Sequence, residues 1–202
     1  MNNKIIAING SYRKGGINDQ FIDAVLAFAG QKDTQTEKIY LIDKHIEFCT
    51  NCRKCASDDR SKRFGGCVFN DDMRGIIEKI ESADRIILAC PVNFSTVTAV
   101  MKRFIERLIC YGYWPWEKWI PVNRIKKKDR VKRAVVFTSS GCPGWLARFL
   151  MPSSLSILKN AANMLGAKVV MSVYLGAVCM AQDQKLNEKQ LKQAQKAAER
   201  LL

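Results

Sequence analysis

The feature that most constrains the fold is a regular alternation of short apolar runs with segments whose apolar residues recur every three or four positions. The runs have the length and β-branched content of buried strands: 4–9, 37–42, 85–90, 131–140 and 167–178. Helical patterns lie between or after them: 18–30, 72–82, 97–108, 153–165 and 187–201. We expect Asn18, Asp72 and Asn187 to cap three of these helices. Strands alternating with helices five times predict an α/β fold, a three-layer doubly wound parallel sheet.

Two segments interrupt the alternation. The first, at about 45–71, is polar, charged and rich in cysteine, and the second, at about 113–130, carries three Trp and many basic residues without a clear period. A chain of 202 residues is the size of one domain, so we expect a single domain over 1–202 with both segments as excursions. No apolar run approaches the roughly 18 residues of a membrane span, and the N-terminal run is too short for a secretory signal. We therefore expect a cytoplasmic protein with no membrane partner.

The carboxyl ends of parallel strands lie at one edge of a sheet, where such folds bind ligands. The loop after the first strand offers a hydroxyl, a guanidinium and free backbone N–H groups at a helix N-terminus, which suits a phosphate. The residues concerned are Ser11, Arg13, Gly16 and Asn18. The loop matches neither the P-loop nor the dinucleotide fingerprint, because Gly16-Ile17 follows Gly15 and Tyr12 occupies the second glycine position. A tight turn with solvated basic side chains is the alternative.

Two further loops are predicted at the same edge. One offers small hydroxyls, an amide and an aromatic ring, and the other offers close backbone approach, which together suit a flat and partly polar ligand. Their residues are Pro91, Val92, Asn93, Phe94, Ser95 and Thr96 in the first, and Ser139, Ser140, Gly141 and Cys142 in the second. Either loop alone would be read as a plain turn between a strand and a helix.

Cysteine spacing is the other strong signal. Cys49, Cys52 and Cys55 are separated by two residues each, and Cys67 follows after eleven. Three thiolates this close can hold an iron–sulfur cluster, with Cys67 as the fourth ligand. Zinc, or thiols without a metal, are the alternatives. Cys90, Cys110 and Cys179 are expected to be small core residues, and the lone His45 an exposed side chain.

Three stretches resemble a known group of proteins. The segment 10–16, the block 49–72 with Asp71-Asp72-Met73, and the segment 91–94 leading to 101–107 resemble the NADPH-dependent FMN reductase and iron–sulfur flavoprotein families of flavodoxin-like fold. The resemblance covers roughly residues 4–110. It implies strand order 2-1-3-4-5, FMN with its phosphate at Ser11, Arg13 and Asn18, and the isoalloxazine against 91–96 and 139–142. Asn93 stands where the family usually has Tyr.

The function that follows is an FMN-dependent oxidoreductase. The resemblance implies electron transfer from NAD(P)H or a donor protein to a small acceptor, a [4Fe-4S] cluster at Cys49, Cys52, Cys55 and Cys67, and a homodimer or homotetramer. The flavin performs the chemistry, so no protein side chain need act as a catalytic acid or base. A flavodoxin-like one-electron carrier is the alternative within flavoproteins.

A nucleic-acid-binding module is the alternative from another class. The chain has 33 Lys and Arg against 19 Asp and Glu, a net charge of +14, which favours acidic or phosphorylated partners. Trp114, Trp116 and Trp119 precede a basic stretch at 124–133, a combination that can bind single strands. We do not expect nucleic acid as the partner, because these rings can equally cover the flavin or a neighbouring subunit.

Overall fold

The computed structural model describes residues 3–202 and has a parallel sheet at its centre. The sheet order is β2-β1-β3-β6-β7, and every neighbouring pair is parallel. The strands are β1 (Lys4–Asn9), β2 (Gln35–Tyr40), β3 (Arg85–Pro91), β6 (Lys132–Ser139) and β7 (Ala167–Leu175). Counted without the short pair β4 and β5, this is order 2-1-3-4-5. The predicted α/β class and strand order are therefore confirmed.

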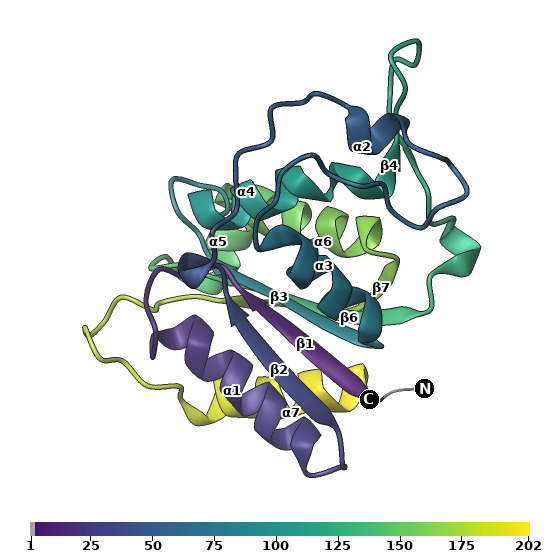
Figure 1. Ribbon diagram of the computed structural model, residues 1–202. Helices are drawn as coiled ribbons and strands as arrows, with labels where there is room; N and C mark the ends of the chain where they lie inside the picture. The colour runs from purple at the N-terminus through teal and green to yellow at the C-terminus, as the bar shows by residue number, and fades with distance from the viewer. Residues whose placement is uncertain (1–2) are drawn as a thin grey trace.

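Helices cover both faces of the sheet (Figure 1). One face packs on α1 (Ile17–Gly30) and α7 (Glu188–Leu201), and the other on α3 (Met73–Ser82), α4 (Ala99–Arg107) and α6 (Ser153–Met164). Strand β1 shows why two layers form, because side chains alternate across a strand. Ile5 and Ala7 join the core beneath α1 and α7, whereas Ile6 and Ile8 join the core on the opposite face. Burial of both sets fixes the register of the sheet.

Some predicted boundaries are wrong. Helix α1 is capped by Gly16, whose backbone is extended, so Asn18 lies within the first turn and is not the cap. Strand β2 ends at Tyr40 because Leu41–Asp43 form a 3₁₀ turn, η1. Asp72 does precede α3, but its carboxylate accepts the His45 N–H instead of capping the helix. Asn187 is an N-cap as predicted, with a reciprocal bond to Gln190.

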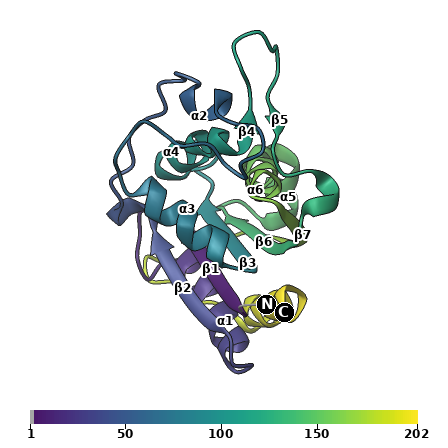
Figure 2. The same cartoon turned by 45° about the vertical axis from the view of Figure 1, so that its right-hand side comes forward.

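The two excursions lie together above the sheet (Figure 2). The cysteine-bearing segment contains one short helix, α2 (Lys54–Ser57). After the 3₁₀ turn η2 (Leu108–Tyr111), β4 (Gly112–Tyr113) and β5 (Val122–Asn123) form an antiparallel hairpin that projects from the molecule. The turn η3 (Lys127–Asp129) then leads into β6, and α5 (Gly144–Leu150) stops before Pro152. Within residues 3–202, none of the helices combines the length and apolarity needed to cross a bilayer.

Candidate functional site

Backbone hydrogen bonds bring the three predicted loops to one edge of the sheet. The Gly10 N–H donates to the carbonyl of Ala89 at 2.8 Å, and the Val92 N–H donates to that of Ser139 at 2.7 Å. The Ser140 N–H extends the same pattern to Leu175 at 2.9 Å. The loops after β1, β3 and β6 therefore begin side by side, at the carboxyl ends of adjacent strands.

Hydrogen bonds hold the loop after β1 against α4, the helix that follows the loop after β3. Thr98 caps α4 by accepting the Met101 N–H, and its hydroxyl donates to the Gly10 carbonyl at 2.6 Å. Gly10 cannot carry a side chain here, because a Cβ would lie 2.8 Å from the Cβ of Met101. The Tyr12 hydroxyl accepts the Ala99 N–H at 3.1 Å. These contacts fix the position of residues 10–12 before any ligand binds.

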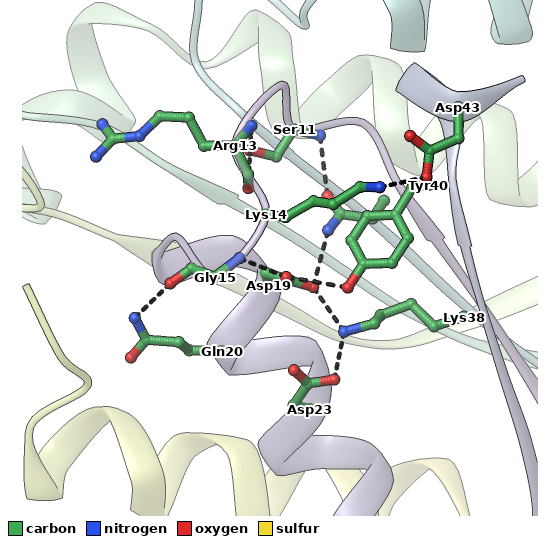
Figure 3. A network of polar contacts seen from close by, with 11 residues as sticks. Ser11, Arg13, Lys14, Gly15, Asp19, Gln20, Asp23, Lys38, Tyr40 and Asp43 are labelled. Atoms are coloured by element: carbon green, nitrogen blue, oxygen red, sulfur yellow. Dashed lines mark hydrogen bonds and ion pairs between the residues drawn. The ribbon is translucent and has the colours of Figure 1, made fainter. Parts of the chain in front are cut away.

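A buried carboxylate organises the other end of the loop (Figure 3). Asp19, in the first turn of α1, accepts the Gly15 N–H at 2.7 Å, the Asn9 amide at 3.2 Å and the Tyr40 hydroxyl at 3.1 Å. Lys38 pairs with Asp19 at 2.6 Å and also with Asp23. The Asp19 side chain is 4% exposed, so its charge is balanced inside the protein by Lys38. Sequence analysis missed this network.

The pKa values of Asp19 and Lys38 are set by two opposing effects, burial and close hydrogen-bond partners. Burial raises the pKa of Asp19, but the bonds from Gly15, Lys38 and Tyr40 outweigh it, and the net pKa is lowered. Burial lowers the pKa of Lys38, but Asp19 and Asp23 raise it further, so the net pKa is raised. Both groups are therefore charged at neutral pH, which keeps Gly15 tied to the helix.

Asn18 is the polar group of the loop that lacks a partner. Its side chain is buried, at 3% exposed, and within residues 3–202 neither its Nδ2 nor its Oδ1 has a hydrogen-bond partner. It lines a cavity of about 120 Å³ together with Ser11, Arg13 and Gly16 of the same loop. Buried polar groups are ordinarily paired, so an orphaned amide in a cavity indicates a polar ligand there. A phosphate oxygen can accept from Nδ2, and the residues present fit the phosphate of FMN.

The same cavity reaches the other two loops. Pro91 at the end of β3 and Ser139 at the end of β6 both line it, so the structure brings members of all three predicted loops together. Ser11 is held in place by its own bonds: its N–H donates to the Asn9 side chain at 2.9 Å, and its hydroxyl accepts the Arg13 N–H at 3.1 Å. The hydroxyl is thus positioned as part of the turn.

A segment that sequence analysis did not single out closes this cavity. Val178 and residues 181–184, after β7, line its outer side. The Arg13 guanidinium donates to the Gln182 carbonyl at 2.8 Å, and Gln20 donates to that of Gln184 at 3.0 Å. In Figure 3 the Arg13 side chain points away from the Asp19 network. Within residues 3–202 Arg13 forms no ion pair, and it lines the cavity together with one acidic residue, Asp183.

The second loop is a strained turn. Asn93 and Thr96 exchange backbone hydrogen bonds at 2.8 and 3.1 Å, which leaves Phe94 and Ser95 in the left-handed region, at φ 45° and 63°. Side chains other than Gly pay a free-energy cost there, and such strain concentrates at ligand sites. Phe94 is fully exposed. Val92, Asn93, Phe94, Ser95 and Thr96 lie outside the 120 Å³ cavity, along the open rim beside it.

The third loop contacts the segment that follows β7. Ser140, Gly141 and Cys142 follow β6, and they too lie outside the cavity that Ser139 lines. The Cys142 carbonyl accepts the Ala177 N–H at 3.0 Å, and the Cys179 thiol contacts the Gly141 carbonyl at 3.4 Å. The prediction that Cys179 is a core residue is wrong: it is exposed, because β7 ends at Leu175. Cys90 and Cys110 are buried as predicted.

The predicted metal ligands surround a second, smaller cavity. Cys49, Cys52, Cys55 and Cys67 all line a space of about 20 Å³. Four thiols suit an iron–sulfur cluster by donor chemistry. Within the described chain, however, no three His, Cys, Asp or Glu side chains are arranged to hold a metal ion. Burial, with the charges of Cys67, Cys49 and Cys52, raises the pKa of Cys55 to about 11.

One buried ion pair holds the cysteine-bearing segment against α4. Arg107 pairs with Asp71 at 2.5 Å, and the two side chains are 2% and 1% exposed. The same guanidinium donates to the Glu47 carbonyl at 2.8 Å and to the Cys67 sulfur at 3.3 Å. Burial raises the pKa of Asp71, but the Arg107 bonds outweigh it and the net pKa is lowered. His45 is exposed as expected and pairs with Glu47.

Comparison with solved structures identifies the class of fold. The structure of an FMN-dependent NADH-azoreductase from Bacillus anthracis in complex with FMN superposes with a TM-score of 0.70 at 15% identity, covering 98% of this chain and 99% of that one. An NADH:FMN oxidoreductase gives a TM-score of 0.61 at 17% identity, covering 98% and 87%. At these identities the likeness concerns the fold, which is the flavodoxin-like fold of flavoproteins.

The sequence identifies the family. The model of the NADPH-dependent FMN reductase family matches residues 3–139, and this chain belongs to that family. An iron-sulfur flavoprotein of Archaeoglobus fulgidus is 38% identical over 112 residues, 55% of this chain and 48% of that protein. One of Methanosarcina thermophila is 33% identical over 106 residues, 52% of each. The matched part thus spans about half the length of these curated relatives.

Proposed function

We propose that the protein is an FMN-dependent oxidoreductase that takes electrons from NAD(P)H or a donor protein and passes them to a small acceptor. Membership of the FMN reductase family supports the flavin. FMN, when bound, supplies the hydride and electron-transfer chemistry. The protein holds and orients it, and no side chain is proposed as a catalytic acid or base.

The observation that carries the proposal is the buried amide of Asn18. An amide that leaves water without gaining a partner costs about 1–3 kcal/mol, and a ligand that accepts from it recovers that cost. The FMN phosphate would be held by Asn18 and the Ser11 hydroxyl, with the backbone N–H groups of the α1 N-terminus. Arg13 would add a charge-assisted bond by leaving the Gln182 carbonyl.

The isoalloxazine is proposed to lie along the open rim formed by 91–96 and 139–142. Exposed apolar side chains mark this rim: Phe94 is fully exposed, and Trp145 is 77% exposed at the start of α5. Large apolar surface of this kind is typical of ligand or subunit contacts. We propose that a second copy of the chain covers the ring, in a homodimer or homotetramer.

We further propose a [4Fe-4S] cluster at Cys49, Cys52, Cys55 and Cys67. Its support is the cavity that all four residues line and the similarity to iron-sulfur flavoproteins. Asn51 and Arg53 have left-handed backbones at φ 53° and 58°, so the strained segment can relax as the thiols converge. Arg107, which donates to the Cys67 sulfur, would stabilise the negative charge of the bound thiolates.

Steady-state oxidation of NADPH with a quinone acceptor tests the reductase. The flavin-loaded protein should turn over faster than the same concentration of free FMN. Asn18→Leu should lose most of this activity at limiting FMN, whereas Asn160→Leu, on the exposed side of α6, should retain it. Turnover no faster than free FMN would remove the reductase and leave a one-electron carrier.

An anaerobic absorption spectrum with iron analysis tests the cluster. We expect broad sulfur-to-iron absorption beneath the two flavin bands. Cys52→Ser should abolish it, and Cys179→Ser should not, although both cysteines are exposed. A wild-type spectrum with flavin bands alone and no iron would contradict the cluster without touching the flavin proposal.

A further inference from the structure

The β4–β5 hairpin exposes aromatic and apolar side chains at its tip, which we define as residues 114–121. Trp119 is 95% exposed, Ile120 72% and Trp116 69%. The hairpin projects beyond the rest of the molecule in both views of the chain (Figures 1 and 2). Neither the flavin rim nor the cysteine cavity includes a tip residue.

Two hydrogen bonds close the turn at the tip. Pro115 and Pro121 have no N–H to satisfy. The Lys118 N–H donates to the Pro115 carbonyl at 3.0 Å, and the Trp114 indole N–H donates to the Lys118 carbonyl at 2.7 Å. The backbone N–H groups of residues 116, 117, 119 and 120 have no hydrogen-bond partner among the described residues, so the tip must stay in contact with water or polar headgroups.

The base of the hairpin is anchored to the body of the protein. The Trp114 N–H donates to the Ala56 carbonyl at 2.7 Å, and Arg124 donates to the carbonyls of Cys55 and Asp58 at 3.2 and 3.0 Å. Arg53 lies 3.6 Å from the centre of the Trp114 ring and 4.5 Å from that of Trp116. The hairpin therefore holds the tip in a defined position on the protein surface.

The segment that carries the tip is basic in sequence. Over 113–130 the chain has six cations and two acids: Lys118, Arg124, Lys126, Lys127, Lys128 and Arg130, against Glu117 and Asp129. Lys118 lies in the tip itself, whereas Lys126, Lys127 and Lys128 are exposed in the segment that follows the hairpin. Indole rings prefer the boundary between water and lipid, and basic side chains next to them attract anionic headgroups.

We propose that the hairpin tip docks the protein on the surface of an anionic lipid bilayer. Trp116, Trp119 and Ile120 would enter the headgroup region, with Lys118 extending back to the phosphates. The tip would stay at that depth, because its open turn cannot enter the hydrocarbon. Docking of this kind needs no membrane-spanning helix, so it agrees with the finding on the described helices, but it departs from the expectation that the protein has no membrane partner.

Shape and charge favour a membrane over a protein partner. A stable protein interface buries about 800 Å² on each side over a broad surface, whereas a projecting tip offers a few side chains that a deformable surface can enclose. The tip itself carries one cation and one acid, Lys118 and Glu117, but a contact between two copies would bring together two chains that each have a net charge of +14. A lipid surface supplies the opposite charge and yields to a convex tip.

Vesicle co-sedimentation of the full-length chain tests the proposal. We expect binding to phosphatidylcholine vesicles containing a third phosphatidylglycerol, much weaker binding to phosphatidylcholine alone, and a blue shift of tryptophan emission. Trp116→Ala with Trp119→Ala should weaken partitioning at least tenfold, because two interfacial rings are lost. Phe149→Ala, which removes an exposed ring on α5, should leave partitioning unchanged.

A charge-matched pair of variants tests the electrostatic part. Lys118→Gln should weaken partitioning about fivefold, on the scale of the contribution of one basic residue near an anionic surface. Lys192→Gln, which removes the same charge from an exposed position of α7, should have a much smaller effect. The tip variants should retain their circular dichroism and bound flavin, which shows that they fold.

Three results would overturn the proposal. The first is no binding to anionic vesicles at low salt, and the second is binding that the Trp116 and Trp119 substitutions leave unchanged. The third combines two observations: the wild-type chain does not bind vesicles, and the same double substitution lowers the mass of the oligomer in light scattering. That result would make the tip a contact between subunits. Tip-dependent binding to polyglutamate in the absence of vesicle binding would instead assign it to an acidic protein.

Discussion

The loop after β1 and the cysteine-bearing segment at 45–71 both gather polar side chains around a cavity, but they are held in place differently. Residues 10–19 join a strand directly to a helix, and Thr98, Asp19 and Lys38 fix them at three points. The cysteine-bearing segment has one short helix, and the buried Arg107–Asp71 pair is its main polar link to α4.

The difference in how the two segments are held accounts for how their polar side chains are arranged. In the first loop, the Asn18 amide is the buried side-chain group without a partner among residues 10–19, so we expect the loop to receive its ligand with no larger change than a shift of the Arg13 side chain. The four thiols share a cavity, yet within residues 3–202 they are not arranged as ligands. A sheet edge preorganises a site, whereas a long loop requires its ligand to complete it.

The largest expected effect is on the buried ion pair that links the cysteine-bearing segment to α4. Arg107→Met leaves Asp71 buried and unpaired, and it should lower the free energy of unfolding by about 3–5 kcal/mol. Urea denaturation measures this. Lys102→Met removes the exposed pair with Glu106 from the same helix and should cost less than about 1 kcal/mol. Equal effects of the two substitutions would refute the role given to Arg107.

A smaller effect is expected from the network of the first loop, because its anchors are shared. Asp19→Asn removes the charge that faces Lys38 and Gly15 and should lower the free energy of unfolding by about 1.5–3 kcal/mol. Asp23→Asn is the control, since Asp23 also pairs with Lys38 but its side chain is 60% exposed. A cost for Asp23→Asn that matches or exceeds that for Asp19→Asn would contradict the account.

Substitution of the orphaned amide should separate stability from binding. Asn18→Leu removes two unpaired buried atoms, so the flavin-free protein should be as stable as wild type or more so. FMN binding should weaken roughly tenfold or more, an effect of about 1.4 kcal/mol or more. Fluorescence titration measures the affinity. Lower stability together with unchanged affinity would mean that the amide serves the fold.

The smallest expected effect is a pH dependence. The folded pKa of Asp19 lies below 3.8, so its stabilising contribution is complete above that value and is lost as pH falls through the folded pKa. The difference in unfolding free energy between wild type and Asp19→Asn should therefore be constant from pH 7 to about pH 5 and shrink below about pH 4. A difference that grows on acidification would have the wrong sign.

The sequence predicts the sheet well because its signals are local. Runs such as 4–9 and 85–90 are apolar over their own length, and Asn187 carries its partner Gln190 three residues away. Leu191 shares the helical spacing of Ala194, Ala198 and Leu201, yet it is 41% exposed whereas those three meet the core. Such differences reflect tertiary packing, which a periodic pattern does not encode.

The candidate site was predicted in part for the same reason. Ser11, Arg13 and Asn18 lie in one loop, so a local pattern identifies them. Asp19 meets Lys38 and Tyr40 only because β1 pairs with β2, and Arg107 meets Asp71 only because α4 packs against the cysteine-bearing segment. Those contacts join residues about 20 and 36 positions apart, and no local signal reports them.

The central claim is that the loop of Ser11, Arg13 and Asn18 holds the phosphate of FMN. The most direct measurement is isothermal titration of the flavin-free protein with FMN and with riboflavin, which differ only in that phosphate. The account predicts that FMN binds at least tenfold more tightly than riboflavin, and that Asn18→Leu reduces this advantage. Equal affinity for FMN and riboflavin would contradict it.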